Sequence, residues 1–187
     1  MATTAVKHLT ADELTAGLDE IRRAPKDVGI LKLIVCRPAE GVREVLETGE
    51  LTLAGGLTGD NWSTRGCPLT PNNAAHPEMQ LNIMNARSIA LIAQARDRWP
   101  LAGDQLYMDL DLSTDNLPPG TRLAVGSAVI EVTAIPHNGC KKFVERFGKD
   151  AVTFVNSDVG KQLHLRGVNA KVVVPGIIHA GDEVRKV

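Results

Sequence analysis

The sequence predicts a mainly β protein, a small β-barrel with two to four peripheral α-helices. Many short β-branched or alternating apolar runs lie between turns rich in glycine and proline, which is typical of closed or partly closed barrels. Only a few segments have apolar residues at helical spacing. The 187 residues, 43% hydrophobic and 23% charged, are enough for one globular domain with its own core.

The composition disfavours several classes of partner and location. The net charge is −1 and aromatic residues make up 3% of the chain, so a nucleic-acid partner is not expected. No apolar run reaches the ~18 residues of a membrane-spanning helix, and residues 1–9 lack the order of a signal peptide. Three widely spaced cysteines fit a reducing compartment. We therefore expect a cytoplasmic protein without a membrane partner; the sequence does not indicate its oligomeric state.

The elements are expected in the following order. A helix is predicted over residues 11–23, because Thr10 and Glu13 have the capping-box spacing and Pro25 ends the apolar repeat. Residues 1–27 are therefore predicted to form an N-terminal helical extension. Further helices are predicted over residues 86–98, at the start of residues 140–148, and over residues 151–160. Strands are predicted at residues 28–35, 42–53 with a turn at 47–50, 80–84, 106–112, 121–125, 128–135, 168–174, and in two short pieces within 177–187.

Residues 136–148 are the predicted chemical centre of the chain. The turn dipeptide Asn138-Gly139 leads to Cys140 at the start of a short helix, and Lys141 and Lys142 follow directly. A helix N-terminus and nearby cations both favour the thiolate form of a cysteine. The thiolate attacks sulfur, carries sulfur or binds a soft metal. The alternative interpretation is a half-buried structural cysteine on a loop.

Two weaker patterns lie in the first half of the chain. Three glycines within residues 55–59 allow either a close approach of the backbone to a ligand or only a tight loop. The long polar stretch at residues 63–78 has the composition of a loop that is functional or mobile. It carries Cys67 and His76, which, with His137 and Cys140, have the side chains of a zinc site. No paired CxxC spacing supports such a site.

Six short pieces of the sequence occur in a fixed order: residues 56–60 (GLTGD), 103–106 (GDQL), 123–126 (LAVG), Cys140 with Arg146, 165–170 (LRGVNA), and Gly176 with 181–184 (GDEV). Together they resemble the MOSC domain, the C-terminal domain of molybdenum cofactor sulfurases. The resemblance covers residues 28–187 and implies a barrel-like MOSC domain in which Cys140 matches the single characteristic cysteine of the family. Asn61 and Trp62 depart from the family pattern, where a basic residue or histidine often follows the first motif.

The resemblance implies two competing activities. In the first, Cys140 carries a persulfide for transfer to the molybdenum cofactor or another acceptor, and His137 and Lys141 assist it. In the second, the protein is a molybdenum-cofactor oxidoreductase that reduces N-hydroxylated compounds, with Cys140 as a ligand of the metal. A non-catalytic module that binds a cofactor or partner is the third reading.

The same resemblance implies a cofactor site and partners. Guanidinium groups form bidentate contacts with phosphate, although ordinary ion pairs are their more common role. The chain looks like a stand-alone member without the pyridoxal-phosphate desulfurase domain, so no pyridoxal phosphate is expected in it. A separate cysteine desulfurase or other sulfur donor is then the expected partner, with the cofactor or a molybdoenzyme as acceptor. The candidate cofactor-binding residues are Gly59, Asp60, Arg65, Lys142, Arg146 and Arg166.

Overall fold

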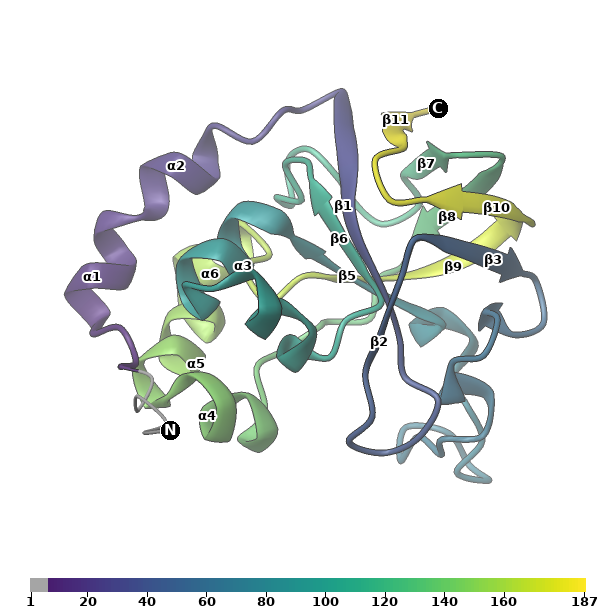
Figure 1. The fold of residues 1–187 in the computed structure, drawn as a ribbon, viewed down its shortest axis with the longest axis horizontal. Helices are drawn as coiled ribbons and strands as arrows, with labels where there is room; N and C mark the ends of the chain where they lie inside the picture. The colour runs from purple at the N-terminus through teal and green to yellow at the C-terminus, as the bar shows by residue number, and fades with distance from the viewer. Residues whose placement is uncertain (1–6) are drawn as a thin grey trace.

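The computed structural model describes residues 7–187, and its centre is a closed barrel of seven strands (Figure 1). The barrel closes because β1 is long enough to pair with β11 at its beginning and with β6 along its middle. The order around the barrel is β11 (Glu183–Lys186), β7 (Arg122–Val125), β8 (Ala128–Val132), β9 (Val168–Val174), β5 (Leu81–Asn85), β6 (Leu106–Asp109) and β1 (Val28–Cys36).

Four short strands extend this barrel. The end of β1 also pairs with β2 (Glu44–Leu46), which adds an eighth strand to the sheet. A second sheet consists of β10 (Gly176–His179), β3 (Thr48–Thr52) and β4 (Gly56–Leu57). All pairings are antiparallel except that of β5 with β6, which is parallel.

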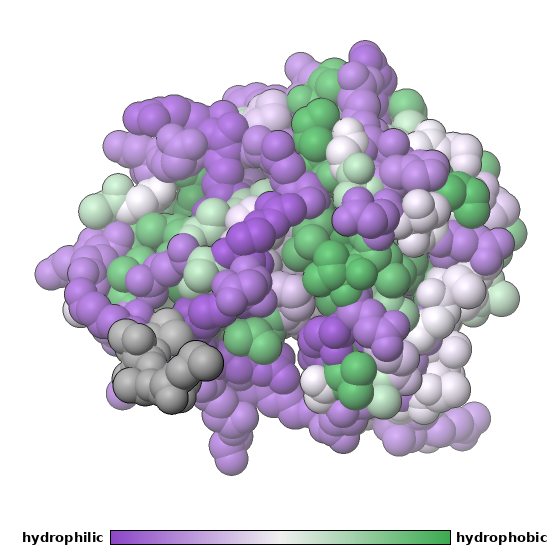
Figure 2. Space-filling view, in the orientation of Figure 1, coloured by the Kyte–Doolittle hydropathy of each residue, from purple (hydrophilic) through white to green (hydrophobic). Residues whose placement is uncertain are grey.

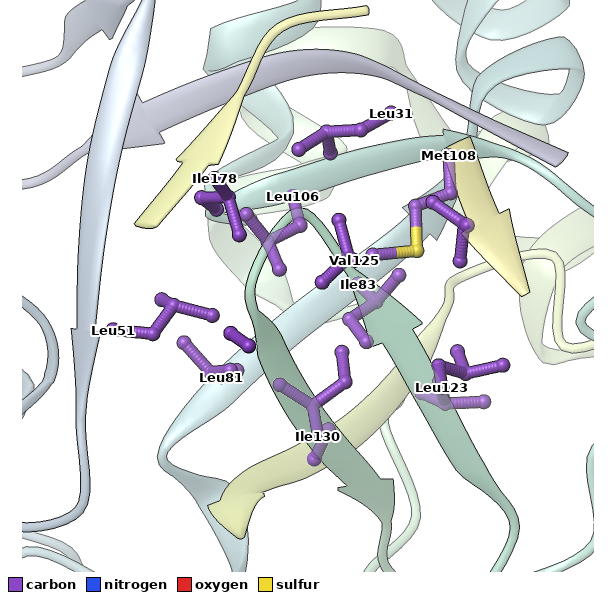
Figure 3. Close-up of a cluster of buried hydrophobic side chains, with 14 of the residues drawn as sticks. Leu31, Leu51, Leu81, Ile83, Leu106, Met108, Leu123, Val125, Ile130 and Ile178 are labelled. Atoms are coloured by element: carbon purple, nitrogen blue, oxygen red, sulfur yellow. The ribbon is translucent and has the colours of Figure 1, made fainter. Parts of the chain in front are cut away.

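The barrel is filled by aliphatic side chains from alternate positions of its strands. Figure 3 shows Leu106 and Met108 of β6 pointing into the same space as Ile83, Val125 and Ile130. Each of these side chains is fully buried. The alternation of inward and outward residues therefore follows the pleat of the strands, as the sequence pattern predicts.

The helices lie together on one side of the barrel (left in Figure 1) and bury a second apolar cluster against its outer surface. Tyr107 belongs to this cluster, and its hydroxyl donates to the carbonyl of Trp99 over 2.8 Å. The α-helices are α1 (Ala11–Ala16), α2 (Leu18–Arg22), α3 (Ala86–Ala93), α4 (Lys141–Phe147), α5 (Lys149–Asn156) and α6 (Asp158–Gln162), and the 3₁₀ turns are η1 (Asn61–Ser63), η2 (Pro77–Met79) and η3 (Arg96–Ala102).

The predicted fold class is confirmed, with six short α-helices in the described chain in place of the two to four expected. The helix predicted over residues 11–23 is divided at Gly17, where the side chain of Leu91 packs against the backbone. The helix predicted over residues 86–98 ends at Ala93, because Gln94 adopts the left-handed conformation with φ 62°. The same apolar pattern then continues into η3.

The strand boundaries contain one clear error. The turn predicted at residues 47–50 is right only at its start: the chain bends at Glu47, between β2 and β3, but β3 runs through residues 48–50, where Gly49 pairs with Ile178 of β10. The strands predicted at residues 106–112 and 128–135 are real but shorter, ending at Asp109 and Val132. Local composition does not reveal these ends, because pairing with a distant strand sets them.

The face seen in Figure 2 is mostly polar, and the broadest of its apolar areas lies near the place where β2 and β3 cross the barrel in Figure 1. Strand β2 carries Val45, which is exposed. Within residues 7–187, no helix has the length and apolar character that crossing a lipid bilayer requires.

Candidate functional site

Cys140 is presented to solvent by a well-anchored segment. It is the N-cap residue of α4 and an exposed free thiol, so the predicted start of a short helix at this cysteine is confirmed. The preceding turn is held to α5, because Gly139 N donates to Asn156 Oδ1 over 2.8 Å and Asn156 Nδ2 donates back to Gly139 O over 3.1 Å. Phe143 and Phe147 bury the other face of α4. A half-buried structural cysteine therefore does not describe Cys140.

A buried ion pair joins the end of β1 to the glycine-rich loop. Arg37 Nε donates to Asp60 Oδ2 over 2.8 Å and Nη2 donates to Oδ1 over 2.9 Å. The two side chains are 3% and 0% exposed. Arg37 Nη1 also donates to Asn82 Oδ1 and to the carbonyl of Gly103. Such a network satisfies almost every polar group of the pair, as a buried charge requires.

A second buried ion pair lies next to it, between Arg166 and Asp104. Arg166 Nη1 is 2.9 and 2.7 Å from the two Asp104 oxygens, and Nη2 donates to the carbonyl of Ala102. Burial raises the pKa of the Asp104 carboxyl, and the Arg166 guanidinium opposes this shift. The guanidinium also stacks on the ring of Phe143, 5.0 Å from its centroid. The pair is thereby connected to the helix that begins after Cys140.

His137 is held neutral in this environment. Its side chain is 13% exposed, with Nδ1 3.5 Å from Asp104 Oδ1. Burial lowers the pKa of His137 well below its usual value, and the positive charges of Arg166, Arg37 and Arg65 lower it further. A neutral imidazole adds no positive field at Cys140, and its lowered pKa makes it a weak acceptor of a proton.

A cavity of about 310 Å³ has Arg37, the arginine of the first ion pair, in its wall. We call it the cationic cavity, because its walls carry Arg37, Arg43, Arg65, Lys142 and Arg146, with Glu40 and Glu145 as the acidic residues. Burial is the main cause that lowers the pKa of Arg43 and of Arg65. Arg37 lowers the pKa of Arg65 further, and Arg146 that of Arg43.

Most of the positive charge in the cationic cavity is not neutralised. Lys142 Nζ contacts Glu40 Oε1 over 2.6 Å, and Arg37 is paired with Asp60. Arg43, Arg65 and Arg146 form no ion pair within residues 7–187. In the same described chain, two buried polar atoms of the cavity, Arg43 Nε and Asn61 Oδ1, have no hydrogen-bond partner. The cavity therefore favours an anion that also carries hydrogen-bonding groups.

A second cavity of about 520 Å³ lies on the other side of the Cys140 segment. We call it the apolar cavity; His137 and Arg166 line it, and it shares no lining residue with the cationic cavity. The residues just before Cys140 border the apolar cavity, and residues just after it border the cationic cavity. Cys140 itself lines neither.

The residues predicted from the sequence divide among these places. Lys141 is exposed in the first turn of α4. Gly59 is exposed, with φ 86°, in the turn that precedes the buried Asp60. The candidate residues do not line a single cavity, because Arg65, Lys142 and Arg146 line the cationic cavity, whereas His137 and Arg166 line the apolar cavity.

Three contributors to this region were missed by the sequence analysis as site residues. Arg37 and Arg43 line the cationic cavity, and Asp104 holds Arg166. Arg37 directly follows β1 and precedes Pro38, so an arginine at the end of an apolar strand was an available signal. Arg43 had no comparable signal, because it lies in an ordinary polar loop.

The four side chains considered for a zinc site are not brought together as one. No group of three or more histidine, cysteine, aspartate or glutamate side chains within residues 7–187 is arranged to hold a metal ion. His76 instead caps η2, its Nδ1 accepting from Glu78 N over 3.2 Å. His137 faces Asp104.

The protein is thus a small closed β-barrel with an exposed cysteine whose flanking residues line two cavities. The chain belongs to the MOSC domain family, whose profile matches residues 70–185, more than half of the sequence. The family is associated with the molybdenum cofactor. The resemblance inferred from the six sequence pieces is thus confirmed.

Solved structures share the fold. YuaD from Bacillus subtilis has a TM-score of 0.64 at 16% identity, over 84% of this chain and 94% of that one. YiiM from Escherichia coli has a TM-score of 0.54 at 20% identity, over 84% and 69% of the two chains. YiiM from Geobacillus stearothermophilus has a TM-score of 0.51 at 13% identity, over 87% and 73%. The search of curated protein sequences produced no match.

Proposed function

We propose that the protein binds the molybdenum cofactor in the cationic cavity and that Cys140 carries a persulfide sulfur for transfer to this cofactor or another acceptor. The observation that carries the proposal is the exposed thiol at the start of α4, the helix whose next residues line a cavity rich in guanidinium groups. A thiol that exchanges sulfur with another protein must be accessible to solvent.

The residues of the cationic cavity fit a phosphorylated, hydrogen-bonding cofactor. Arg43, Arg65 and Arg146 would hold its phosphate, since planar guanidinium groups match phosphate oxygens. Arg43 Nε and Asn61 Oδ1 offer a buried donor and acceptor without partners in the described chain, which suits a heterocycle. When bound, the cofactor would supply the molybdenum centre that accepts sulfur.

The step that loads Cys140 with sulfur from the donor protein needs no oxidant. The Cys140 thiolate attacks the outer sulfur of a persulfide on the donor protein, a new S–S bond forms, and the donor cysteine leaves as a thiolate. Lys141, which follows Cys140 directly, is proposed to assist this attack as a neighbouring cation. Burial lowers the pKa of His137 well below its usual value and makes its imidazole a weak base, so the proton of the exposed thiol is proposed to pass to solvent, with His137 only bordering the segment that presents Cys140. A pyridoxal-phosphate-dependent cysteine desulfurase is the proposed donor.

The test is loading with sulfur. Incubation with a cysteine desulfurase and cysteine should add one sulfur at Cys140, a mass gain of about 32 Da that dithiothreitol removes. Cys140→Ser should abolish the gain, whereas Cys36→Ser, which changes a buried thiol, should retain it. Sulfur found on Cys67 in place of Cys140, or no loading at all, would refute the carrier role.

The second candidate is a molybdenum-dependent reductase of N-hydroxylated compounds, with Cys140 as a soft ligand of the metal. The closeness of α4 to the cationic cavity favours it, because one helix then borders both thiol and cofactor. Protein purified from a host that makes the cofactor should then contain stoichiometric molybdenum and pterin, with Cys140 protected from alkylation. Retention of cofactor and partner binding by Cys140→Ser, without any activity, would support the non-catalytic module.

Location and domain boundaries are part of the same proposal. Three free thiols in the described chain are consistent with a reducing compartment, and we propose the cytoplasm. We also propose that residues 28–187 form the MOSC domain and that residues 1–27 are an appended helical extension.

A further inference from the structure

We propose that the apolar cavity is a binding site for a small organic acid, a carboxylate on a flat or compact apolar body. The cavity, about 520 Å³, has the size of an ordinary small-molecule site. It shares no lining residue with the cationic cavity, so the inference does not depend on cofactor binding.

The walls of the cavity fit an apolar body. They come from the loop after β6, the end of β8, the start of β9 and helices α5 and α6. Because these elements are packed on two different cores, the space between them is preformed. The apolar residues that line it include Leu117, Pro119, Val132, Ile135, Val155 and Val168.

Two of the side chains that line the cavity carry a buried hydrogen-bonding atom without a partner in the described chain. Arg166 is 7% exposed; its Nη atoms bind Asp104 and Ala102, but its buried Nε has no partner. His137 Nδ1 also lacks one. An unsatisfied buried donor costs free energy, and an acceptor on a ligand that reached it would recover it.

The charge of the lining selects an acid over a neutral acceptor. Lys161 is exposed at the wall and has no ion-pair partner within residues 7–187. No aspartate or glutamate occurs among the lining residues of this described cavity, and the nearby Asp104, which contacts Arg166 and His137, is compensated by Arg166. Asp104 already neutralises the charge of Arg166. The guanidinium would therefore orient the bound carboxylate through Nε, and Lys161 would supply the net positive charge.

His164 stiffens the wall of the cavity. It adopts the left-handed conformation with φ 47°, and its Nδ1 lies 2.6 Å from the carbonyl of Leu112. The left-handed conformation of His164 ends α6 directly after Leu163, so the conformation is explained by the helix terminus and the hydrogen bond fixes the position of the ring in the wall.

The first experiment measures binding to the unmodified protein by NMR titration, with benzoate as the probe and benzamide as its uncharged counterpart. Benzoate should shift the backbone amides of residues 133–138 and 161–168 and bind about tenfold more tightly than benzamide, because its acceptor is charged. Equal affinities for the two compounds, or shifts confined to residues around the cationic cavity, would overturn the proposal.

Matched variants then locate the site. Ala134 is exposed and lines the cavity, so Ala134→Trp should fill it and abolish benzoate binding, while the exposed Ala54→Trp should not change it. Lys161→Gln should weaken binding about twofold to fivefold, the scale of an exposed charge contact, and Lys149→Gln should leave it unchanged. Unchanged binding by a folded Ala134→Trp protein would also overturn the proposal. Sulfur loading of Cys140 is measured separately, so failure of one proposal does not affect the other.

Discussion

At the scale of single residues, two buried ion pairs hold the region under the Cys140 segment. Asp60 was expected to contact a cofactor, and its carboxylate is instead fully occupied by Arg37 and by the backbone amide of Trp62. A buried pair adds little net stability by itself, but removal of one partner leaves an uncompensated charge. Asp60 therefore acts on the cationic cavity indirectly, because it orients the Arg37 side chain in the cavity wall.

Asp60→Ala should accordingly lower the free energy of unfolding by about 3–5 kcal/mol, because the Arg37 guanidinium would remain buried without a counter-charge. Urea denaturation measures the change. Asp19→Ala serves as the control, since Asp19 pairs with Arg22 on the surface and should contribute less than about 1 kcal/mol. Similar effects of the two substitutions would mean that the Arg37–Asp60 pair is not buried in solution.

His137 makes stability depend on pH. Its pKa in the folded protein is well below the unfolded value, chiefly through burial and then through Arg166, so between these two values only the unfolded chain binds the proton. Stability should therefore fall as the pH is lowered from 7 to 5, by at most about 1.4 kcal/mol per pH unit below 6.5. His137→Gln should remove this part of the pH dependence. Parallel stability curves for the two proteins would contradict the depressed pKa.

At the scale of elements, close backbone contacts determine how the strands meet the site. Gly167 lies just before β9, with φ 108°, and an added Cβ there would be 2.1 Å from the carbonyl oxygen of Ile83 in β5. The neighbouring Arg166 must keep its position against Asp104 for the site to form. Residue 167 must therefore be a glycine, because a side chain there would prevent the close approach of β5 and β9.

Gly167→Ala should destabilise the protein by about 3 kcal/mol or more, because both the backbone conformation and the contact with Ile83 are unfavourable. Gly120→Ala is the matched control, since Gly120 has a similar φ of 89° but open space around it. It should cost only the strain of the conformation, about 1 kcal/mol. Thermal or urea unfolding compares the two; equal losses would show that strain alone is responsible.

At the scale of the whole molecule, the cationic cavity is assembled from segments distant in sequence. Arg43 follows β1, Arg65 follows η1, and Arg146 lies on α4. Three guanidinium groups without an ion pair in the described chain reinforce one another only when the barrel and α4 are docked. The clustering of these positive charges therefore depends on the tertiary structure and is not encoded by any single sequence motif.

The double substitution Arg43→Gln and Arg65→Gln should reduce retention of the molybdenum cofactor at least about tenfold, because each charge-assisted contact with phosphate is worth about 1.5–3 kcal/mol. Molybdenum and pterin content after purification from a cofactor-producing host provides the measurement. Arg22→Gln, on the exposed face of α2, should have no effect. Full cofactor content in the double variant would place the cofactor elsewhere.

The sequence alone determined the fold class, the order of most strands and the position of Cys140 at a helix start, because alternating apolar residues, turn dipeptides and caps are local signals. Only the tertiary structure decided which charges are available. Asp60 and Arg166 were expected to contact a ligand, but both form buried ion pairs. Arg37 and Arg43 were not singled out from the sequence, but both line the cationic cavity. The physical reason is that ion pairing, burial and cavity formation depend on segments far apart in the chain, which no local pattern records.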